Sequence, residues 1–352
     1  MKSSIDIKKN KVSLVITSIN KQNMAIKNFY KLCYKNNVNF YLVGDKKTPE
    51  YKNKKNFKFL SLNFQKKLFF QSVNKTPINS YSRKNIGYLY AMINGSKIIY
   101  ESDDDNYPKQ NFFTQNLINL KIQQIEENGF INIYKYFNKK NDLIWPRGLP
   151  LSELDKTNKS SKKSSTNLRK FIIIQRLCDE NPDVDAIYRL INNKINIKFL
   201  TNKGYYTKKN SYIPFNSQNT IWTSYAFPLM YLPSNCTMRS TDIWRSYIAY
   251  YILNKMNKKV LFTSPTVYQK RNFHNLYSDF NLEIPVYRDV QKIIKSLSKV
   301  NIYKSRKFIL RNLFNCYKQL VKINIFKKKE MDILKSWCND ISLIDKKLIK
   351  IK

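Results

Sequence analysis

Residues 98–106 read Ile-Ile-Tyr-Glu-Ser-Asp-Asp-Asp-Asn, an apolar run that ends in three consecutive carboxylates. Such a run is typical of a buried strand, and three adjacent carboxylates repel one another unless a cation neutralises them. In an extended chain, Asp103 and Asp105 project to the same side and Asp104 points away. The pair suits a hard divalent cation, Mn²⁺ or Mg²⁺, which binds carboxylate oxygens and shares its other positions with water and phosphates. A solvated acidic turn is the alternative interpretation.

The composition indicates a folded chain without selecting a partner. With 352 residues, the chain is long enough for one large domain or two ordinary domains. Hydrophobic residues make up 42% and aromatic residues 14%, which excludes a disordered chain. The net charge of +40 would ordinarily indicate nucleic acid or an anionic membrane. Most of the excess is lysine, however, and abundant Asn, Ile and Tyr with only six Gly indicate a coding bias spread over the surface. We therefore expect no specific nucleic-acid binding.

Cysteine and histidine usage argues against a zinc site. The five cysteines lack CxxC spacing, and the chain has a single histidine. An odd, dispersed set of cysteines is typical of reduced thiols in the cytosol. The N-terminus lacks the pattern of a secretory signal, and no apolar run approaches the roughly 20 residues that span a bilayer. We expect a cytoplasmic protein, soluble or peripheral on a membrane.

The N-terminal part of the chain has the pattern of a βαβ unit. Residues 12–19 and 38–43 are short apolar runs typical of parallel strands, and the segment between them has apolar residues at helical spacing. Ligands of such units bind beyond the carboxyl ends of the strands. Those ends carry Thr17, Ser18 and Asp45. These side chains can bind a base or ribose, or can cap the following helix.

Another helix is predicted over residues 86–93, with a left-handed stop at Gly95. Arg83 and Lys84 precede it, where basic residues oppose the helix dipole. A helix N-terminus with these two cations would bind a diphosphate. The alternative is that both are ordinary surface cations.

Several motifs follow one another along the chain. They are residues 81–91, residues 99–106 with the acidic triplet, Trp-Pro-Arg-Gly at 145–148, Pro-Asp-Val-Asp-Ala-Ile-Tyr-Arg at 182–189 and Asp-Ile-Trp-Arg at 242–245. Together they resemble the STELLO-type glycosyltransferase-like domain and, more distantly, the reversibly glycosylated polypeptides of plants. The resemblance implies an α/β fold of the nucleotide-sugar (GT-A-like) type, a mixed sheet with helices on both faces and the acidic motif at its centre. It also implies metal-dependent transfer of a sugar from a nucleotide diphosphate, such as a UDP-sugar, to a hydroxyl of a glycan or lipid-linked saccharide.

The resemblance and the local patterns together predict the residues of the site. The cation would be held by Asp103, Asp105 and the lone histidine, His274. Asp242 is expected to act as the base that deprotonates the acceptor hydroxyl, and Asp104 is a second catalytic candidate. The predicted donor-binding residues are Thr17, Ser18, Asp45, Arg83, Lys84 and Arg147. The predicted acceptor-binding residues are Trp145, Asp183, Asp185, Trp244 and Arg245.

Simpler structural roles are open for several of these residues. Asp183 and Asp185 can cap the helix that follows them, and Asp242 is favourable at a helix start by the dipole alone. His274 can be a hydrogen-bonded structural residue, and the Trp-Pro-Arg-Gly segment can be a stiff connector. The amide-rich segment of residues 212–220 suits sugar hydroxyls, or is an ordinary turn.

The last part of the chain is helical in pattern and very basic. We expect a GT-A-like domain over residues 1–288 and a basic helical extension over residues 289–352. Amphipathic basic helices can lie on an anionic membrane or on an assembly partner, or can pack on the domain with their lysines in solvent. Two other functions compete with a transferase: a catalytically silent binding domain of the same fold, and a nucleic-acid-binding protein.

Overall fold

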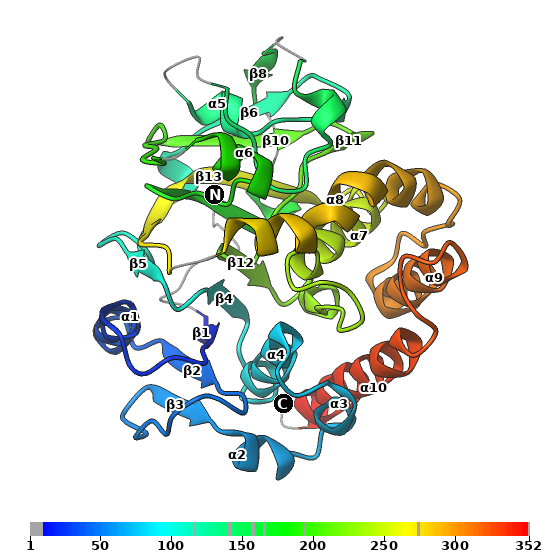
Figure 1. Cartoon of the computed structure of the whole chain (residues 1–352). Helices are drawn as coiled ribbons and strands as arrows, with labels where there is room; N and C mark the ends of the chain where they lie inside the picture. The colour runs from blue at the N-terminus through cyan, green and yellow to red at the C-terminus, as the bar shows by residue number, and fades with distance from the viewer. Residues whose placement is uncertain are drawn as a thin grey trace.

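A mixed β-sheet runs through the computed structural model (Figure 1). The structure describes residues 10–115, 117–138, 143–155, 159–164, 167–192, 194–272 and 275–350. The strands are β1 (Val12–Thr17), β2 (Asn39–Val43), β3 (Phe57–Leu60), β4 (Ile98–Ser102), β5 (Asn106–Pro108), β6 (Lys121–Ile125), β7 (Gly129–Phe130), β8 (Ser161–Lys163), β9 (Phe171–Asp179), β10 (Lys203–Thr207), β11 (Ser211–Tyr212), β12 (Asn219–Thr223) and β13 (Lys259–Gln269). Neighbouring strands follow the order β3–β2–β1–β4–β12–β9–β13–β10–β6–β8, β5 pairs with β13, and β7 pairs with β11 separately.

Helices pack on both faces of this sheet. They are α1 (Met24–Lys35), α2 (Leu62–Lys66), α3 (Gln71–Lys75), α4 (Lys84–Ile93), α5 (Tyr134–Phe137), α6 (Ala186–Ile191), α7 (Thr241–Lys255), α8 (Leu276–Leu297), α9 (Ile309–Lys322) and α10 (Glu330–Lys350). Alternate residues of β1 point to opposite faces: Leu14 and Ile16 pack in the core that contains α1, and Val15 packs in the core that contains α4. Burial on both faces explains why β1 is a continuous apolar run.

One glycine allows α4 to lie close to the sheet. A Cβ atom at Gly87 would lie 2.4 Å from Val43 Cγ2 and 2.7 Å from Val15 Cγ1. Any larger residue would therefore push α4 away from β1 and β2. Because α4 begins beside the acidic triplet, this contact also fixes how near the helix start comes to the end of β4.

The fold confirms the predicted GT-A-like α/β class. The expected strands at residues 12–19 and 38–43 and the expected helix at 86–93 correspond to β1, β2 and α4. β4, which leads to the acidic triplet, lies in the interior of the sheet between β1 and β12. The sheet is mixed because β12 runs antiparallel to both β4 and β9.

The C-terminal helices contribute to the same hydrophobic core as the sheet. The expected boundary after residue 288 falls inside α8, and α10 returns to pack on α3 and α4 (Figure 1). Asp340 caps α3 by accepting hydrogen bonds from the backbone N–H groups of Gln71 and Ser72, both at 2.8 Å. Trp337 of α10 is fully buried and donates to the carbonyl of Pro228 at 3.0 Å. Of the two arrangements considered for these helices, packing on the domain is the one observed.

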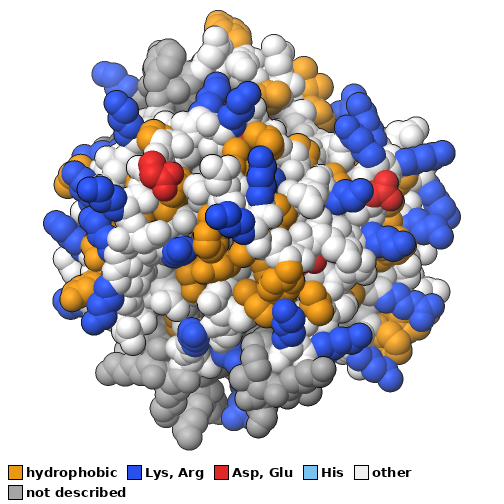
Figure 2. All heavy atoms as spheres, turned by 90° about the horizontal axis from the view of Figure 1, so that it is seen from below, with side chains coloured by type: hydrophobic (Ala, Val, Ile, Leu, Met, Phe, Trp, Pro, Cys, Tyr) orange, Lys and Arg blue, Asp and Glu red, His pale blue; other side chains and the backbone are white. Residues whose placement is uncertain are grey.

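The basic charge is not gathered into one patch on the face drawn in Figure 2. On the face drawn in Figure 2, Lys and Arg side chains are scattered around apolar patches, with few acidic side chains among them. Within the described residues, no helix combines the length and the apolar character that crossing a membrane requires.

Candidate active site

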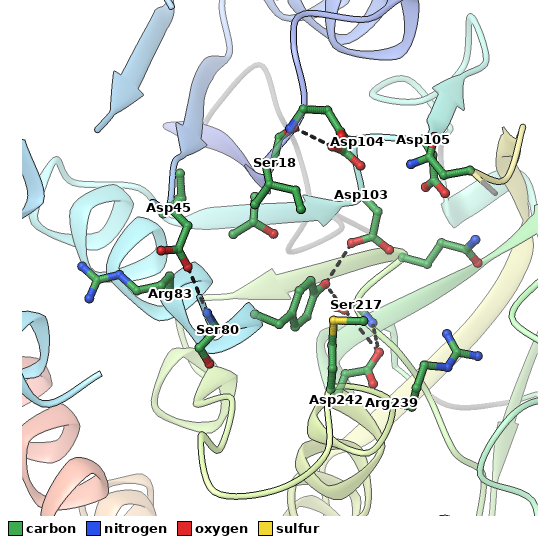
Figure 3. A pocket seen from close by; sticks show the side chains of 18 of the residues that line it. Ser18, Asp45, Ser80, Arg83, Asp103, Asp104, Asp105, Ser217, Arg239 and Asp242 are labelled. Carbon is green, nitrogen blue, oxygen red and sulfur yellow. Dashed lines mark hydrogen bonds between the residues drawn. The ribbon is translucent and has the colours of Figure 1, made fainter. Parts of the chain in front are cut away.

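A pocket opens where the strand order reverses. β1 pairs in parallel with β2 on one side and with β4 on the other, so the carboxyl ends of β1 and β4 flank a topological switch point. The cavity there has a volume of about 810 Å³, within the range of small-molecule sites (Figure 3). Six of the chain's 24 acidic residues line it, although the chain is strongly basic: Asp45, Asp103, Asp104, Asp105, Asp183 and Asp242. This concentration of carboxylates makes the cavity the candidate functional site.

The acidic triplet forms a turn rather than a continuation of the strand. β4 ends at Ser102, and the backbone N–H of Asn106 donates to the carbonyl of Asp103 at 3.3 Å. Strand alternation, the reason given for pairing Asp103 with Asp105, therefore does not apply, because the residues are not extended. The side chain of Asp104 turns toward the end of β1, where it accepts hydrogen bonds from Ser18 Oγ and from Asn20 Nδ2.

Asp103 lies above a buried lysine at the start of α4. Its Oδ1 accepts a hydrogen bond from the Tyr81 hydroxyl at 2.8 Å and lies 3.2 Å from Lys84 Nζ. Burial raises the pKa of Asp103 to about 6, although the charge of Lys84 opposes the rise. Lys84 is itself fully buried and also donates to the carbonyl of Ser102 at 2.8 Å. Lys84, which was predicted to bind donor phosphates, therefore contacts the acidic turn in this structure.

Asp105 is held by a residue of β13. Its Oδ2 accepts a hydrogen bond from Gln269 Nε2 at 2.9 Å. Burial is the main cause that raises its pKa, and the negative charge of Asp104 adds to the effect. The negative charge of Asp105 in turn adds to the raised pKa of Asp103 by repulsion. A divalent cation would relieve both the burial of charge and this repulsion.

The donor set suits a cation that shares its coordination with a substrate. No group of three His, Cys, Asp or Glu side chains in the described part of the chain is placed to hold a metal ion. The predicted third ligand, His274, lies outside the described residues. Two carboxylates, completed by water and phosphate oxygens, are a common donor set for Mg²⁺. Asp103 and Asp105 therefore fit a cation that is bound together with a diphosphate.

Arg147 joins two carboxylates on the opposite wall of the pocket. Gly148, in the left-handed region at φ +96°, turns the chain there and leaves no space for a Cβ beside Ile243. The guanidinium of Arg147 contacts Asp183 at 3.0 and 2.8 Å and Asp242 at 3.0 and 3.1 Å. Asn216 and Ser217, from the amide-rich segment, complete the hydrogen bonds of these two carboxylates.

The partner of Asp242 makes it a weak base. Burial alone would raise the pKa of Asp242, but the charge and hydrogen bonds of Arg147, with help from Arg245 and Ser217, lower it to about 2. A general base works best with a pKa near the operating pH. The geometry therefore favours a positioning role for Asp242, and the predicted role as base gains no support from it.

Several other predicted residues are bound to neighbours within the protein. Arg83 lines the cavity, but its guanidinium donates to Gln65 and to the carbonyls of Val73 and Thr76. Trp145 is buried and donates to Asp185, which caps α6 at the backbone N–H of Tyr188. The capping alternative thus describes Asp185.

The two remaining acceptor candidates belong to the interior. Trp244 is 1% exposed in the core, and Arg245 forms a buried ion pair with Glu101 at 2.8 Å. Glu101 also accepts from the Trp222 indole at 2.8 Å, so the pair ties β4, β12 and α7 together. Neither Trp244 nor Arg245 lines the cavity.

At the β1 and β2 end, the three candidates all border the cavity. Thr17 is the last residue of β1, Ser18 comes directly after it, and Asp45 follows β2. The carboxylate of Asp45 accepts hydrogen bonds from the backbone N–H groups of Asn79 and Ser80, at 2.9 and 3.0 Å (Figure 3). Asp45 therefore holds the segment that leads into α4, rather than capping a helix after its own strand.

Sequence reasoning missed some residues of the pocket. Tyr81, Gln269, Arg239 and Arg271 all line it. Tyr81 and Arg239 lie inside or beside the quoted motifs, so position within a motif was a signal that could have identified them. Gln269 and Arg271 carry no such signal, because only the pairing of β13 with β5 brings them beside the acidic turn.

An acidic turn at the switch point of a mixed sheet, over a pocket of this size, places the protein in the class of GT-A-like glycosyltransferase folds. Sequence comparison agrees: residues 239–351 match a family described as STELLO glycosyltransferases. In Arabidopsis thaliana, a protein named "Probable glycosyltransferase STELLO2" is 27% identical over 285 residues, which are 76% of this chain and 37% of that protein. A second, "Probable glycosyltransferase STELLO1", is 28% identical over 246 residues, 64% of this chain and 32% of that protein.

The chain is thus similar to STELLO-type glycosyltransferases, in line with the resemblance of its motifs. The alignments span about a third of the length of the two plant relatives. The matched family region includes both Asp242 and the C-terminal helices, so it crosses the domain boundary expected after residue 288.

Proposed function

We propose that this protein transfers a sugar from a nucleotide diphosphate, a UDP-sugar in the simplest case, to a hydroxyl of a glycan or lipid-linked saccharide. The observation that carries the proposal is the acidic turn of Asp103, Asp104 and Asp105 at the β1–β4 switch point, inside the cavity. In α/β sheets, ligands bind at such a point. The similarity to STELLO glycosyltransferases supports the same class of reaction.

The pocket would hold the donor with its nucleoside toward the ends of β1 and β2. Thr17, Ser18 and the segment held by Asp45 border that end, and the acidic turn lies next to it. Mn²⁺ or Mg²⁺ held by Asp103 and Asp105 would stabilise the charge of the departing nucleotide. The hydrogen bonds from Tyr81 and Lys84 both reach Oδ1 of Asp103, on the side of the turn that faces α4.

The opposite wall would orient the acceptor. Arg147 holds Asp183 and Asp242 rigidly, and Asn216 and Ser217 add amide and hydroxyl groups beside them. Such polar groups, fixed by their neighbours, can position sugar hydroxyls without reorganising. Asp104 is bound to Ser18 and to Asn20, so we propose that it shapes the loop after β1 instead of reacting.

The test is a titration of the purified protein with UDP and with a panel of nucleotide sugars, with and without Mn²⁺. We expect tighter binding with Mn²⁺ and release of UDP from at least one UDP-sugar. Binding without release in the presence of varied acceptors would favour a silent binding domain. If no nucleotide or nucleotide sugar bound in either condition, the proposed transfer would be refuted.

Membrane contact is a separate proposal about the basic C-terminal helices. Leu313, Leu320 and Leu334 face the core, whereas many lysines of these helices are exposed and would be the groups that attract an anionic membrane. Such contact would be electrostatic and would weaken with salt. Co-sedimentation with phosphatidylserine vesicles at low and high salt tests it, and equal binding to neutral vesicles would contradict it.

A further inference from the structure

Two arginines line the end of the pocket that lies away from β1 and β2. Arg239 comes from the loop before α7, and Arg271 follows β13. Figure 3 shows Arg239 and Asp45 on opposite sides of the pocket, with Asp103 between them. If the nucleoside lies near Asp45 and the diphosphate near Asp103, the end with the two arginines is the part of the cavity left for the acceptor.

Both guanidinium groups are held in place from α8. Arg239 contacts Glu283 through Nε at 2.7 Å and through Nη2 at 2.5 Å. Arg271 contacts Asp279 through Nη2 at 2.6 Å. Glu283 is fully buried and also accepts from the backbone N–H of Ala186, so its negative charge is shared with the start of α6. These acids fix the orientation of the arginines, whose side chains are only 12% and 13% exposed.

Arg239, Arg271 and the nearby Arg189 form a cluster in which some buried N–H groups have no acceptor among the described residues. Arg271 Nε is buried and has no hydrogen-bond partner among the described residues. The same holds for Nε of Arg189, which lies on α6 close enough to feel the charges of both pocket arginines. Buried donors without acceptors are costly, and a ligand that accepts hydrogen bonds lowers that cost.

The positive charges of the cluster repel one another. The pKa of Arg189 falls to about 9, first because of burial and then because of the charges of Arg271 and Arg239. The carboxylates that face the cluster are Glu283, Asp279, Asp183, Asp185 and Asp105. Of these, Asp183 pairs with Arg147, and Asp185 accepts a hydrogen bond from the backbone of α6. Both carboxylates therefore have other partners than the arginines of the cluster.

We propose that Arg239 and Arg271 form an anion-binding subsite for the acceptor, which takes a carboxylate or a phosphate group on the acceptor saccharide. Guanidinium groups bind both of these oxyanions in a planar, two-pronged geometry. A neutral sugar would leave the Arg271 N–H without an acceptor and the mutual repulsion without relief. Beside the arginines, Met238 lines the pocket with 54% of its surface exposed and offers an apolar contact for a sugar ring. The assignment of this subsite to the acceptor rests on the proposed transfer, whereas the binding of an anion there does not.

The experiment compares glucuronate, glucose 6-phosphate and glucose as ligands, by calorimetry, with UDP and Mn²⁺ present and then absent. We expect at least one of the two anionic sugars to bind tenfold or more tightly than glucose, and which one does so identifies carboxylate or phosphate as the group. Arg239→Gln and Arg271→Gln should each weaken that binding at least tenfold. Lys292→Gln, which removes an exposed cation from α8, should leave it unchanged.

A variant with the opposite effect separates the proposal from misfolding. Asp279→Asn releases Arg271 from its ion pair, so it should tighten anionic binding severalfold, which an unfolded protein cannot do. Glucose binding as tightly as both anions, or equal losses in Lys292→Gln, would overturn the subsite. Displacement of UDP by the anionic sugars would also overturn it, because the arginines would then belong to the donor diphosphate. Failure of UDP to bind refutes only the proposed transfer, since the anion measurement without UDP still stands.

Discussion

The charge of Asp103 is expected to destabilise the metal-free protein. Its pKa is about 6 because burial outweighs the nearby ammonium group of Lys84, whereas an unperturbed aspartate titrates near 3.8. Folding therefore disfavours the ionised carboxylate at pH 7 by roughly 3 kcal/mol at most. The side chain keeps 30% exposure to water, which lowers this figure. Asp103→Asn removes the charge, so it should raise the free energy of unfolding at pH 7 by about 1–3 kcal/mol.

The pH dependence identifies the cause. A carboxyl whose pKa rises on folding binds more protons in the folded state, so this group makes the wild type more stable as the pH falls from 7 toward about 4. Urea unfolding of the wild type, Asp103→Asn and the exposed control Asp332→Asn, all in a chelator, measures this. The advantage of Asp103→Asn should be present at pH 7 and disappear near pH 4, where the wild-type carboxyl is already neutral. If Asp103→Asn had no higher free energy of unfolding than the wild type at pH 7, the reasoning would be refuted. The same holds if its gain over the wild type were equal at pH 7 and pH 4.

Three further substitutions test the ion pairs of Arg147, the contact of Gly87 with the sheet and the hydrogen bond of the buried Trp145. Arg147→Met leaves two buried carboxylates without their cation, and should lower the free energy of unfolding by about 3–5 kcal/mol in urea; a loss below about 1 kcal/mol would contradict the ion-pair account. Gly87→Ala should cost about 1–3 kcal/mol in the same assay, because its methyl group meets Val43 and Val15, and an unchanged midpoint would mean that α4 has room. Trp145→Phe removes the hydrogen bond to Asp185 and should cost about 1 kcal/mol while leaving UDP affinity unchanged. Tenfold weaker UDP binding would show that Trp145 acts in the pocket.

The elements that carry the pocket were predictable from local patterns. Apolar runs at residues 12–19 and 38–43 predict parallel strands because both faces of those strands are buried. Polar residues at the ends of such strands gather at one edge of the sheet, and this is why Thr17, Ser18 and the acidic triplet border one cavity. The cap at Asp185 followed equally from a local rule.

Side-chain directions were not predictable, because they depend on distant partners. Arg83 and Lys84 are adjacent, yet one donates to Gln65 beyond β3 and the other to Asp103 beyond β4. The ion pair of Glu101 and Arg245 joins residues far apart in the chain, and no spacing rule connects them. The same limit applies to Asp242, whose low pKa comes from Arg147 and whose position at a helix start says nothing of that partner.

The most direct test of the account is the effect of Mn²⁺ on UDP affinity in the wild type and in Asp103→Asn/Asp105→Asn, measured by calorimetry. If the two carboxylates hold the cation that binds the diphosphate, Mn²⁺ should tighten UDP binding at least tenfold in the wild type. In the double variant, which should remain folded, Mn²⁺ should have no effect on UDP affinity. A double variant that retains the Mn²⁺ enhancement would contradict the assignment of Asp103 and Asp105 as the metal-binding pair.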